Sequence, residues 1–218
     1  MRGVEVLLQH GWAWDASCFS AWQSTVPGAF RLAAADRGYF GSPALSPARP
    51  QLVVAHSFGL HLLAPEYLDR ARLVVIIGGF RSFHPEEGAA SRRSQRLIAR
   101  MRQRLRREPE DLLRDFYARC FYPEESPFVA PASPDLGLLG QDLEKLDTHT
   151  LDLEPLAAVE RLLLLHGSRD CIVPLERATR LHRELSASSL QIIEGAGHAL
   201  PFTHAPQCWE FIRQAWTA

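Results

Sequence analysis

Ser57 is the residue of this sequence best placed to act as a nucleophile. It follows the apolar run 52–55, which predicts a short buried strand because it is rich in β-branched residues and carries no charge. Small residues, Ala55 and Gly59, stand two positions before and after it, and they leave room for a sharp strand-to-helix turn. Such a turn would lift the hydroxyl clear of the sheet. The alternative is that Ser57 only caps a helix, as serine often does.

Asp170 and His198 are the candidate acid and base. Each follows a predicted strand, at 161–166 and 190–193, so three strand-end loops would bring them to the same sheet edge as Ser57. A serine hydroxyl becomes a good nucleophile when a base takes its proton, and histidine can do so near neutral pH. The carboxylate would hold the imidazole in the right tautomer. Taken alone, Asp170 could be a helix N-terminal acid and His198 a plain loop residue.

The negative charge that develops on an attacked carbonyl oxygen needs hydrogen-bond donors. The expected donors are the backbone N–H groups of Phe58 and Trp12, each worth about 2.7–4 kcal/mol in the transition state. Other side chains near these positions could line an acyl channel, although ordinary core packing explains them equally well. The expected substrate contacts are Trp12, His56, Phe116, Tyr117, Phe121 and Tyr122.

Strands that alternate with helices predict a parallel sheet covered on both faces. The six expected strands are 4–9, 30–35, 52–55, 73–77, 161–166 and 190–193, and helices are expected at 16–26, after Ser57, at 174–185 and at 205–216. Segment 44–50 is too short for a crossover helix. The alternation of strands and helices stops over residues 80–152, where only helices are expected, at 91–108, 112–121 and 136–146. We therefore expect a core of residues 1–79 and 153–218 and a helical lid of residues 80–152 over the strand ends.

Composition narrows the possible functions. The 218 residues carry a net charge of −1, which argues against nucleic-acid binding, and no apolar run is long enough to span a bilayer. The four cysteines have neither metal nor disulfide spacing, and there is no phosphate-binding glycine loop or metal-ligand cluster, so no metal and no cofactor is predicted. The first residues carry no secretory signal, and the cytoplasm is the expected compartment. We expect neither a nucleic-acid nor a membrane partner.

Five motifs together resemble those of the α/β-hydrolase superfamily. They are HGW at 10–12, DRGYFGSP at 36–43, AHSFG at 55–59, HGSRDCIVP at 166–174 and GHALPF at 197–202. The resemblance implies an α/β-hydrolase fold, with a mostly parallel sheet of about six strands, helices on both faces and a helical lid insertion. It also implies catalysis by a Ser57–His198–Asp170 triad through an acyl-enzyme.

Within the superfamily, the chain resembles the esterases that hydrolyse pimeloyl-acyl-carrier-protein methyl ester in biotin synthesis. The further segments are LDLEPL at 151–156 and HALPFTHAP at 198–206, whereas AHSFG replaces that family's common GWSxG. The resemblance implies release of methanol and pimeloyl-acyl-carrier protein. It also implies that lid arginines dock the carrier, here Arg92, Arg93, Arg96 and Arg100.

The charge of the expected lid fits such a partner. Residues 92–107 hold eight arginines and no acid, and a basic face would attract an acidic carrier protein. The simpler interpretation of this run is a solvated helix face. Two other functions therefore stay open, a general short-chain carboxylesterase with incidental lid charge and a non-catalytic ligand-binding protein on a hydrolase scaffold.

Overall fold

Six strands form one parallel sheet in the order β2-β1-β3-β4-β5-β6. This computed structural model describes residues 3–45, 49–129, 131 and 133–217. The strands are β1 (Val4–Gln9), β2 (Phe30–Ala35), β3 (Leu52–His56), β4 (Leu73–Ile77), β5 (Arg161–Gly167) and β6 (Ser188–Ile193). The expected six-stranded parallel sheet is confirmed. Among the described residues between β2 and β3 there is no helix, and residues 46–48 of the segment 44–50 lie outside the described residues.

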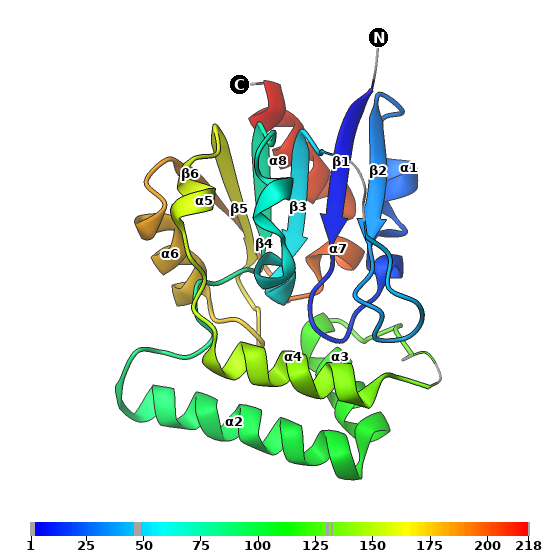
Figure 1. The fold of residues 1–218 in the computed structure, drawn as a ribbon, viewed down its shortest axis with the longest axis vertical. Coiled ribbons are helices and arrows are strands. Elements are labelled where there is room, and N and C mark those ends of the chain that lie inside the picture. Colours follow the sequence, from blue (N-terminus) through cyan, green and yellow to red (C-terminus); the bar gives the residue numbers. More distant parts are fainter. Residues whose placement is uncertain (1–2, 46–48, 130, 132, 218) are drawn as a thin grey trace.

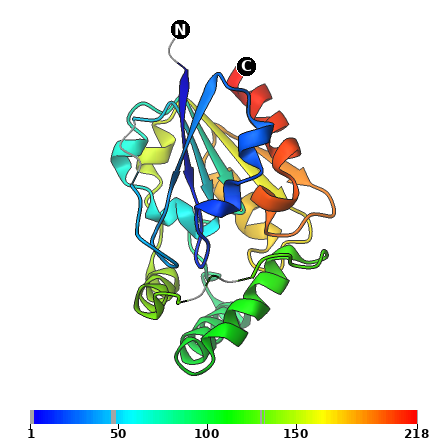
Figure 2. The same cartoon turned by 90° about the vertical axis from the view of Figure 1, so that its right-hand side faces the viewer.

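Alternate side chains of the sheet enter two separate apolar layers. In β1, Val6 and Leu8 belong to one layer, whereas Leu7 belongs to the other. The first layer is covered by η1 (Ala16–Phe19), α1 (Trp22–Thr25), α7 (Leu200–Thr203) and α8 (Ala205–Thr217). The second is covered by η2 (Ser57–Leu62), η3 (Pro65–Tyr67), α5 (Glu154–Ala157) and α6 (Leu175–Glu184). Figure 2 shows helices on both sides of the sheet, as the sequence predicts.

Two expected helices differ from the observed ones. The segment 16–26 is split between η1 and α1, and Val26 is extended because Pro27 follows it. The segment after Ser57 forms the short 3-10 helix η2 rather than an α-helix. It stops at Leu62, and Ala64 is extended, with ψ of 140°, because the ring of Pro65 disfavours helical backbone at the preceding residue.

Three long helices lie beyond the carboxyl ends of the strands (Figure 1). They are α2 (Gly88–Arg107), α3 (Pro109–Phe121) and α4 (Leu136–Thr148), and we call them the cap helices. The apolar stripe of α2 buries Ile98 and Leu105. A proline at the first position of α3 is compatible with a helix start. The helices expected between 91 and 146 are therefore present, whereas the division into a core and a lid stays a prediction.

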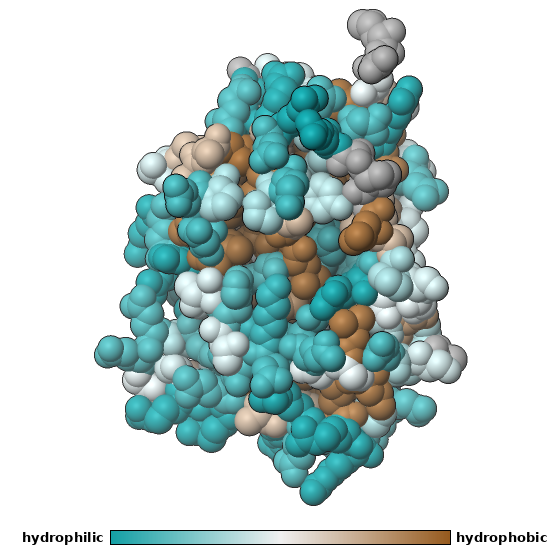
Figure 3. Space-filling model, viewed as in Figure 1, coloured by the Kyte–Doolittle hydropathy of each residue, from teal (hydrophilic) through white to brown (hydrophobic). Residues whose placement is uncertain are grey.

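The surface near α2 is strongly polar. Figure 3 shows hydrophilic side chains along the lower edge of the molecule, where α2 lies. No helix in the described part of the chain combines the length and the apolar character needed to cross a bilayer. All four cysteines are free, and Cys171 alone among them is exposed.

Candidate active site

Ser57 occupies a strained turn between β3 and η2. Its φ of +55° lies in the left-handed region, which costs a residue other than glycine about 1–3 kcal/mol. The turn also packs tightly against the backbone that follows β1. A Cβ on Gly59 would lie 2.5 Å from the carbonyl oxygen of His10, so a side chain at position 59 would push these segments apart. The sequence therefore needs glycine two residues after the serine.

A continuous chain of hydrogen bonds joins Ser57, His198 and Asp170. The Nε2 atom of His198 lies 3.0 Å from the Ser57 Oγ atom, and its Nδ1 atom lies 2.7 Å from Asp170 Oδ2. The three residues come from the loops after β3, β5 and β6, and all three are buried or nearly so. The structure thus brings together the three residues that the sequence nominates for catalysis.

Asp170 is held as a carboxylate. Burial opposes its ionisation, but the neighbouring His198, which also donates a hydrogen bond, holds the carboxyl pKa below its ordinary value. The backbone N–H groups of Ile172 and Val173 donate to Oδ1, both over 2.8 Å. Because a carboxylate only accepts, His198 Nδ1 carries the proton and Nε2 is free to accept the Ser57 hydroxyl. This arrangement can activate the serine oxygen for attack on a carbonyl carbon.

Two further buried histidines support this chain. The Nε2 atom of His56 lies 3.0 Å from the carbonyl oxygen of His198, and burial lowers the His56 pKa to about 3. The Nε2 atom of His166 lies 2.9 Å from the carbonyl oxygen of Val173 and 3.6 Å from Asp170 Oδ2. Because a carbonyl only accepts, both Nε2 atoms donate, and both histidines hold loop backbone in place.

The loop after β1 passes directly beside the serine turn. A Cβ on Gly11 would lie 3.0 Å from the Ser57 Cβ and 3.5 Å from the Phe58 backbone nitrogen. The indole of Trp12 donates to the carbonyl of Leu139 in α4 over 2.9 Å, which holds this loop to the cap helices. Trp12 thus lines the same cavity as Ser57, and Phe58 follows Ser57 in the chain. Their role as oxyanion donors stays a prediction.

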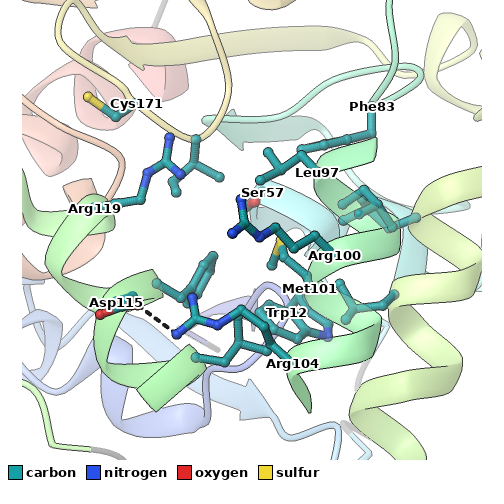
Figure 4. Close-up of a pocket in the computed structure, with 16 residues that line it drawn as sticks. Trp12, Ser57, Phe83, Leu97, Arg100, Met101, Arg104, Asp115, Arg119 and Cys171 are labelled. Atoms are coloured by element: carbon teal, nitrogen blue, oxygen red, sulfur yellow. Dashed lines mark hydrogen bonds and ion pairs between the residues drawn. The ribbon is translucent and has the colours of Figure 1, made fainter. Parts of the chain in front are cut away.

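A cavity of about 110 Å³ opens at Ser57, between the sheet and the cap helices. Figure 4 shows its walls, which are mostly apolar, together with the arginine side chains that extend towards it. The lining residues are Trp12, Ser57, Phe83, Leu97, Ile98, Arg100, Met101, Arg104, Leu112, Asp115, Phe116, Arg119, Leu143, Leu146, Cys171 and Ile172. Within the described ranges, no group of three or more His, Cys, Asp or Glu side chains could hold a metal ion.

Only part of the expected substrate-contact set lines this cavity. Trp12 and Phe116 do, and their rings pack edge to face. Tyr117 instead donates to the Ala13 carbonyl over 2.7 Å, deep in the core. The buried Phe121 and His56 and the exposed Tyr122 do not line the cavity either. These four residues do not line this cavity, and their expected contacts with substrate stay a prediction.

The cap helices supply most of the lining that sequence reasoning missed. Leu97, Ile98 and Met101 of α2 line the cavity. Arg104 and Arg119 reach the cavity from α2 and α3. Of the four arginines expected to dock a carrier, Arg100 lines the cavity. The other three, Arg92, Arg93 and Arg96, are exposed along α2.

Comparison with known proteins shows what this arrangement resembles. Residues 145–213 match the family model described as TAP-like protein. An esterase from Exiguobacterium antarcticum superposes with a TM-score of 0.82 at 15% identity, covering 99% of this chain and 92% of that one. A bromoperoxidase from Bacillus anthracis gives a TM-score of 0.80 at 20% identity, with the same coverage. At these identities the likeness concerns the fold.

A shorter match concerns sequence. A protein of Synechocystis sp. named "Putative non-heme chloroperoxidase" is 48% identical over 46 residues, which are 21% of this chain. The matched segment spans only 17% of that protein's length.

Proposed function

Because the chain has the α/β-hydrolase fold, we propose that it is a serine carboxylesterase with Ser57 as the nucleophile. One observation carries the proposal: His198 lies within hydrogen-bond distance of both Ser57 Oγ, at 3.0 Å, and Asp170 Oδ2, at 2.7 Å. Each hydrogen bond has the direction that nucleophilic catalysis requires. The serine also faces a cavity with apolar walls, which suits the acyl chain of an ester.

The reaction proceeds in two halves. Ser57 Oγ attacks the ester carbonyl carbon while His198 Nε2 takes the hydroxyl proton, and Asp170 stabilises the resulting imidazolium. The tetrahedral oxyanion is bound by the backbone N–H groups of Trp12 and Phe58. His198 then gives its proton to the departing alcohol, which leaves an acyl-enzyme. In the second half, His198 takes a proton from water, which attacks the acyl-enzyme carbonyl. His198 then returns the proton to Ser57 Oγ, and the carboxylic acid is released.

The finer proposal is that the substrate is pimeloyl-acyl-carrier-protein methyl ester, cleaved to methanol and pimeloyl-acyl-carrier protein. The motif resemblance supports it, as does the position of the basic helix α2 beside the cavity. Arg92, Arg93, Arg96 and Arg100 are exposed there and would attract an acidic carrier protein. Attraction of this kind speeds the encounter and weakens as salt is added.

Two assays test the two levels of the proposal. Wild type is expected to hydrolyse a short-chain nitrophenyl ester, and Ser57→Ala is expected to lose that activity. Ser24→Ala, which changes an exposed serine of α1, serves as the control. Inactivity of wild type on all esters would support a non-catalytic binding protein. Equal activity of Ser57→Ala and wild type would refute catalysis by Ser57.

The second assay uses the carrier-linked methyl ester at low and high salt. Turnover that falls with added salt supports carrier docking. Salt-insensitive turnover of that ester favours a general esterase. If the enzyme cleaves simple esters but leaves the carrier-linked methyl ester intact, the biotin-pathway assignment is refuted. Complementation of a biotin auxotroph that lacks its pimeloyl methyl esterase, with Ser57→Ala as control, gives the same answer in cells.

A further inference from the structure

Among the described residues, two of the arginines at the cavity have no acidic partner. Arg104 is neutralised, because it donates to Glu108 over 2.7 Å and to Asp115 over 2.8 Å. Arg100 of α2 and Arg119 of α3 form no salt bridge within the described part of the chain. Both line the cavity, and Figure 4 shows Arg100 beside Ser57 and Arg119 on the opposite side, towards Cys171. The cavity lining therefore holds three arginines and one acid, Asp115, so its charged side chains carry more positive than negative charge.

The cavity that contains Arg100 and Arg119 has the length and the walls to hold an extended, chain-shaped ligand. The cavity follows α2 from Leu97 to Arg104, about 10 Å at a rise of 1.5 Å per residue. Along that length its walls include Ile98, Met101 and Phe116, which suit methylene groups. A ligand that fills the cavity would therefore contact both its apolar walls and the arginine side chains.

We propose that Arg100 and Arg119 form an anion-binding subsite that selects esters whose acyl portion carries a carboxylate or phosphate beyond the reacting carbonyl. The guanidinium group suits such an anion, because its planar fork can donate two parallel hydrogen bonds to one oxyanion. Both arginines are exposed, so solvent weakens the attraction to an anion, and two arginines are needed for a sizeable effect. This inference rests on the proposed esterase function, since it assumes that Ser57 holds the acyl group.

The subsite differs from long-range docking of a carrier protein. Arg92, Arg93 and Arg96 do not line the cavity, so they cannot contact a group within it. Arg100 and Arg119 do line it and would contact small substrates that have no carrier at all. Selectivity among free esters therefore separates the two effects.

The experiment compares mono-p-nitrophenyl adipate with p-nitrophenyl hexanoate, which have six-carbon acyl chains and differ in the terminal carboxylate. The double variant Arg100→Gln/Arg119→Gln is expected to lower the kcat/KM ratio of adipate to hexanoate about tenfold, chiefly by raising KM for the adipate ester. Both arginines are exposed, so each single variant should lower the ratio only a few-fold. The control Arg106→Gln/Arg107→Gln removes the same charge from exposed positions of α2 outside this cavity and should leave the ratio unchanged.

A second pair of substrates distinguishes the two sources of the anion. The methyl ester of pimeloyl-phosphopantetheine is compared with the same ester lacking the phosphate. In each pair, the kcat/KM of the anionic ester is divided by that of the neutral ester. If the double variant lowers this ratio for the phosphate pair but not for the adipate pair, the subsite binds a carrier-arm phosphate. The opposite result assigns it to a free carboxylate. An unchanged ratio for both pairs, or an equal fall in the control, overturns the subsite.

A binding measurement tests the subsite separately if the protein proves not to be an esterase. If wild type cleaves none of these esters, binding of monomethyl adipate to Ser57→Ala is measured by calorimetry against Ser57→Ala/Arg100→Gln/Arg119→Gln. About tenfold weaker binding to the triple variant supports the subsite in a protein that is not an esterase. Equal binding refutes the subsite as well.

Discussion

His56 Nε2 lies 3.0 Å from the backbone carbonyl oxygen of His198, so the residue before the nucleophile holds the loop of the base. The two imidazole rings are 4.9 Å apart, and the His56 ring is fully buried. Because burial lowers its pKa to about 3, His56 stays neutral and keeps donating to this carbonyl at physiological pH. This bond ties the Ser57 turn to a segment more than 140 residues further along the chain.

Removing this hydrogen bond should slow catalysis without weakening substrate binding. His56→Phe fills a similar volume but cannot donate, and we expect kcat to fall about tenfold with KM nearly unchanged. His56→Gln retains an N–H donor and should recover part of the loss. Steady-state kinetics on a nitrophenyl ester and the pH profile of kcat measure this, with thermal unfolding to confirm that both variants fold. Equal activity of both variants with wild type would mean that His56 does not position the base.

Gly78 lies against the imidazole of His198. Its φ is +59°, and a Cβ there would lie 3.2 Å from both Cε1 and Nδ1 of that ring. Gly78→Ala should therefore displace His198 and lower kcat more than about tenfold. Gly195→Ala is the matched control, because Gly195 also has a positive φ, of +78°, but its Cβ would meet no atom within 4 Å. If the two variants lose kcat equally, backbone strain rather than contact with His198 is responsible.

Gly59 should be required for stability as well as for the serine turn. The Cβ of Gly59→Ala would lie 2.5 Å from the His10 carbonyl oxygen and 2.7 Å from that of Gln9, and backbone atoms cannot rotate away. We expect the free energy of unfolding to fall by about 3 kcal/mol, at the upper end of overpacking effects. Gly28→Ala, with no atom within 4 Å, should change it by less than about 0.5 kcal/mol. Urea unfolding of both variants measures the difference, and similar losses would contradict the steric explanation.

Acid should destabilise the protein before its carboxylates titrate. Burial lowers the pKa of His56 from 6.5 to about 3 and that of His61 from 6.5 to about 4. Between pH 6.5 and 4, the unfolded chain therefore binds protons that the folded chain does not, and stability falls as the pH falls. Each histidine contributes up to about 1.4 kcal/mol per pH unit. The lowered pKa of Asp170 acts in the same direction, but around and below pH 3.8.

Urea unfolding at several pH values from 4.5 to 7.5 tests this dependence. His61→Gln should reduce the slope of unfolding free energy against pH by up to about 1.4 kcal/mol per unit. Ser24→Ala, which removes no titratable group, should leave the slope unchanged. A wild-type slope of zero across the window would contradict neutral burial of these histidines.

The sheet and the three strand-end residues could be predicted because their signals are local. Runs such as 52–55 and 73–77 are apolar on both faces, and parallel strands place the loops of Ser57, Asp170 and His198 at one edge. The sequence predicted a helix after Ser57 without its end, and the structure forms the short 3-10 helix η2, which stops before Pro65. That proline was the signal for its end.

The cavity lining depends on how distant segments pack, which no local pattern encodes. Tyr117 and Phe121 are aromatic residues on a cap helix, as Phe116 is, yet only Phe116 faces Ser57. The rotation of α3 about its axis decides this, and contacts with Trp14 fix that rotation. The donor role of His56 likewise depends on a carbonyl more than 140 residues away.

Covalent labelling of Ser57 tests the proposed nucleophile most directly. The protein is incubated with a p-nitrophenyl alkylphosphonate, and the adduct is located by peptide mass spectrometry in wild type, Ser57→Ala and Ser24→Ala. We predict one phosphonyl adduct on Ser57, no adduct in Ser57→Ala, an unchanged adduct in Ser24→Ala, and loss of esterase activity in proportion to labelling. An adduct on another residue that accounts for the loss of activity, or full esterase activity in Ser57→Ala, would contradict catalysis by this serine.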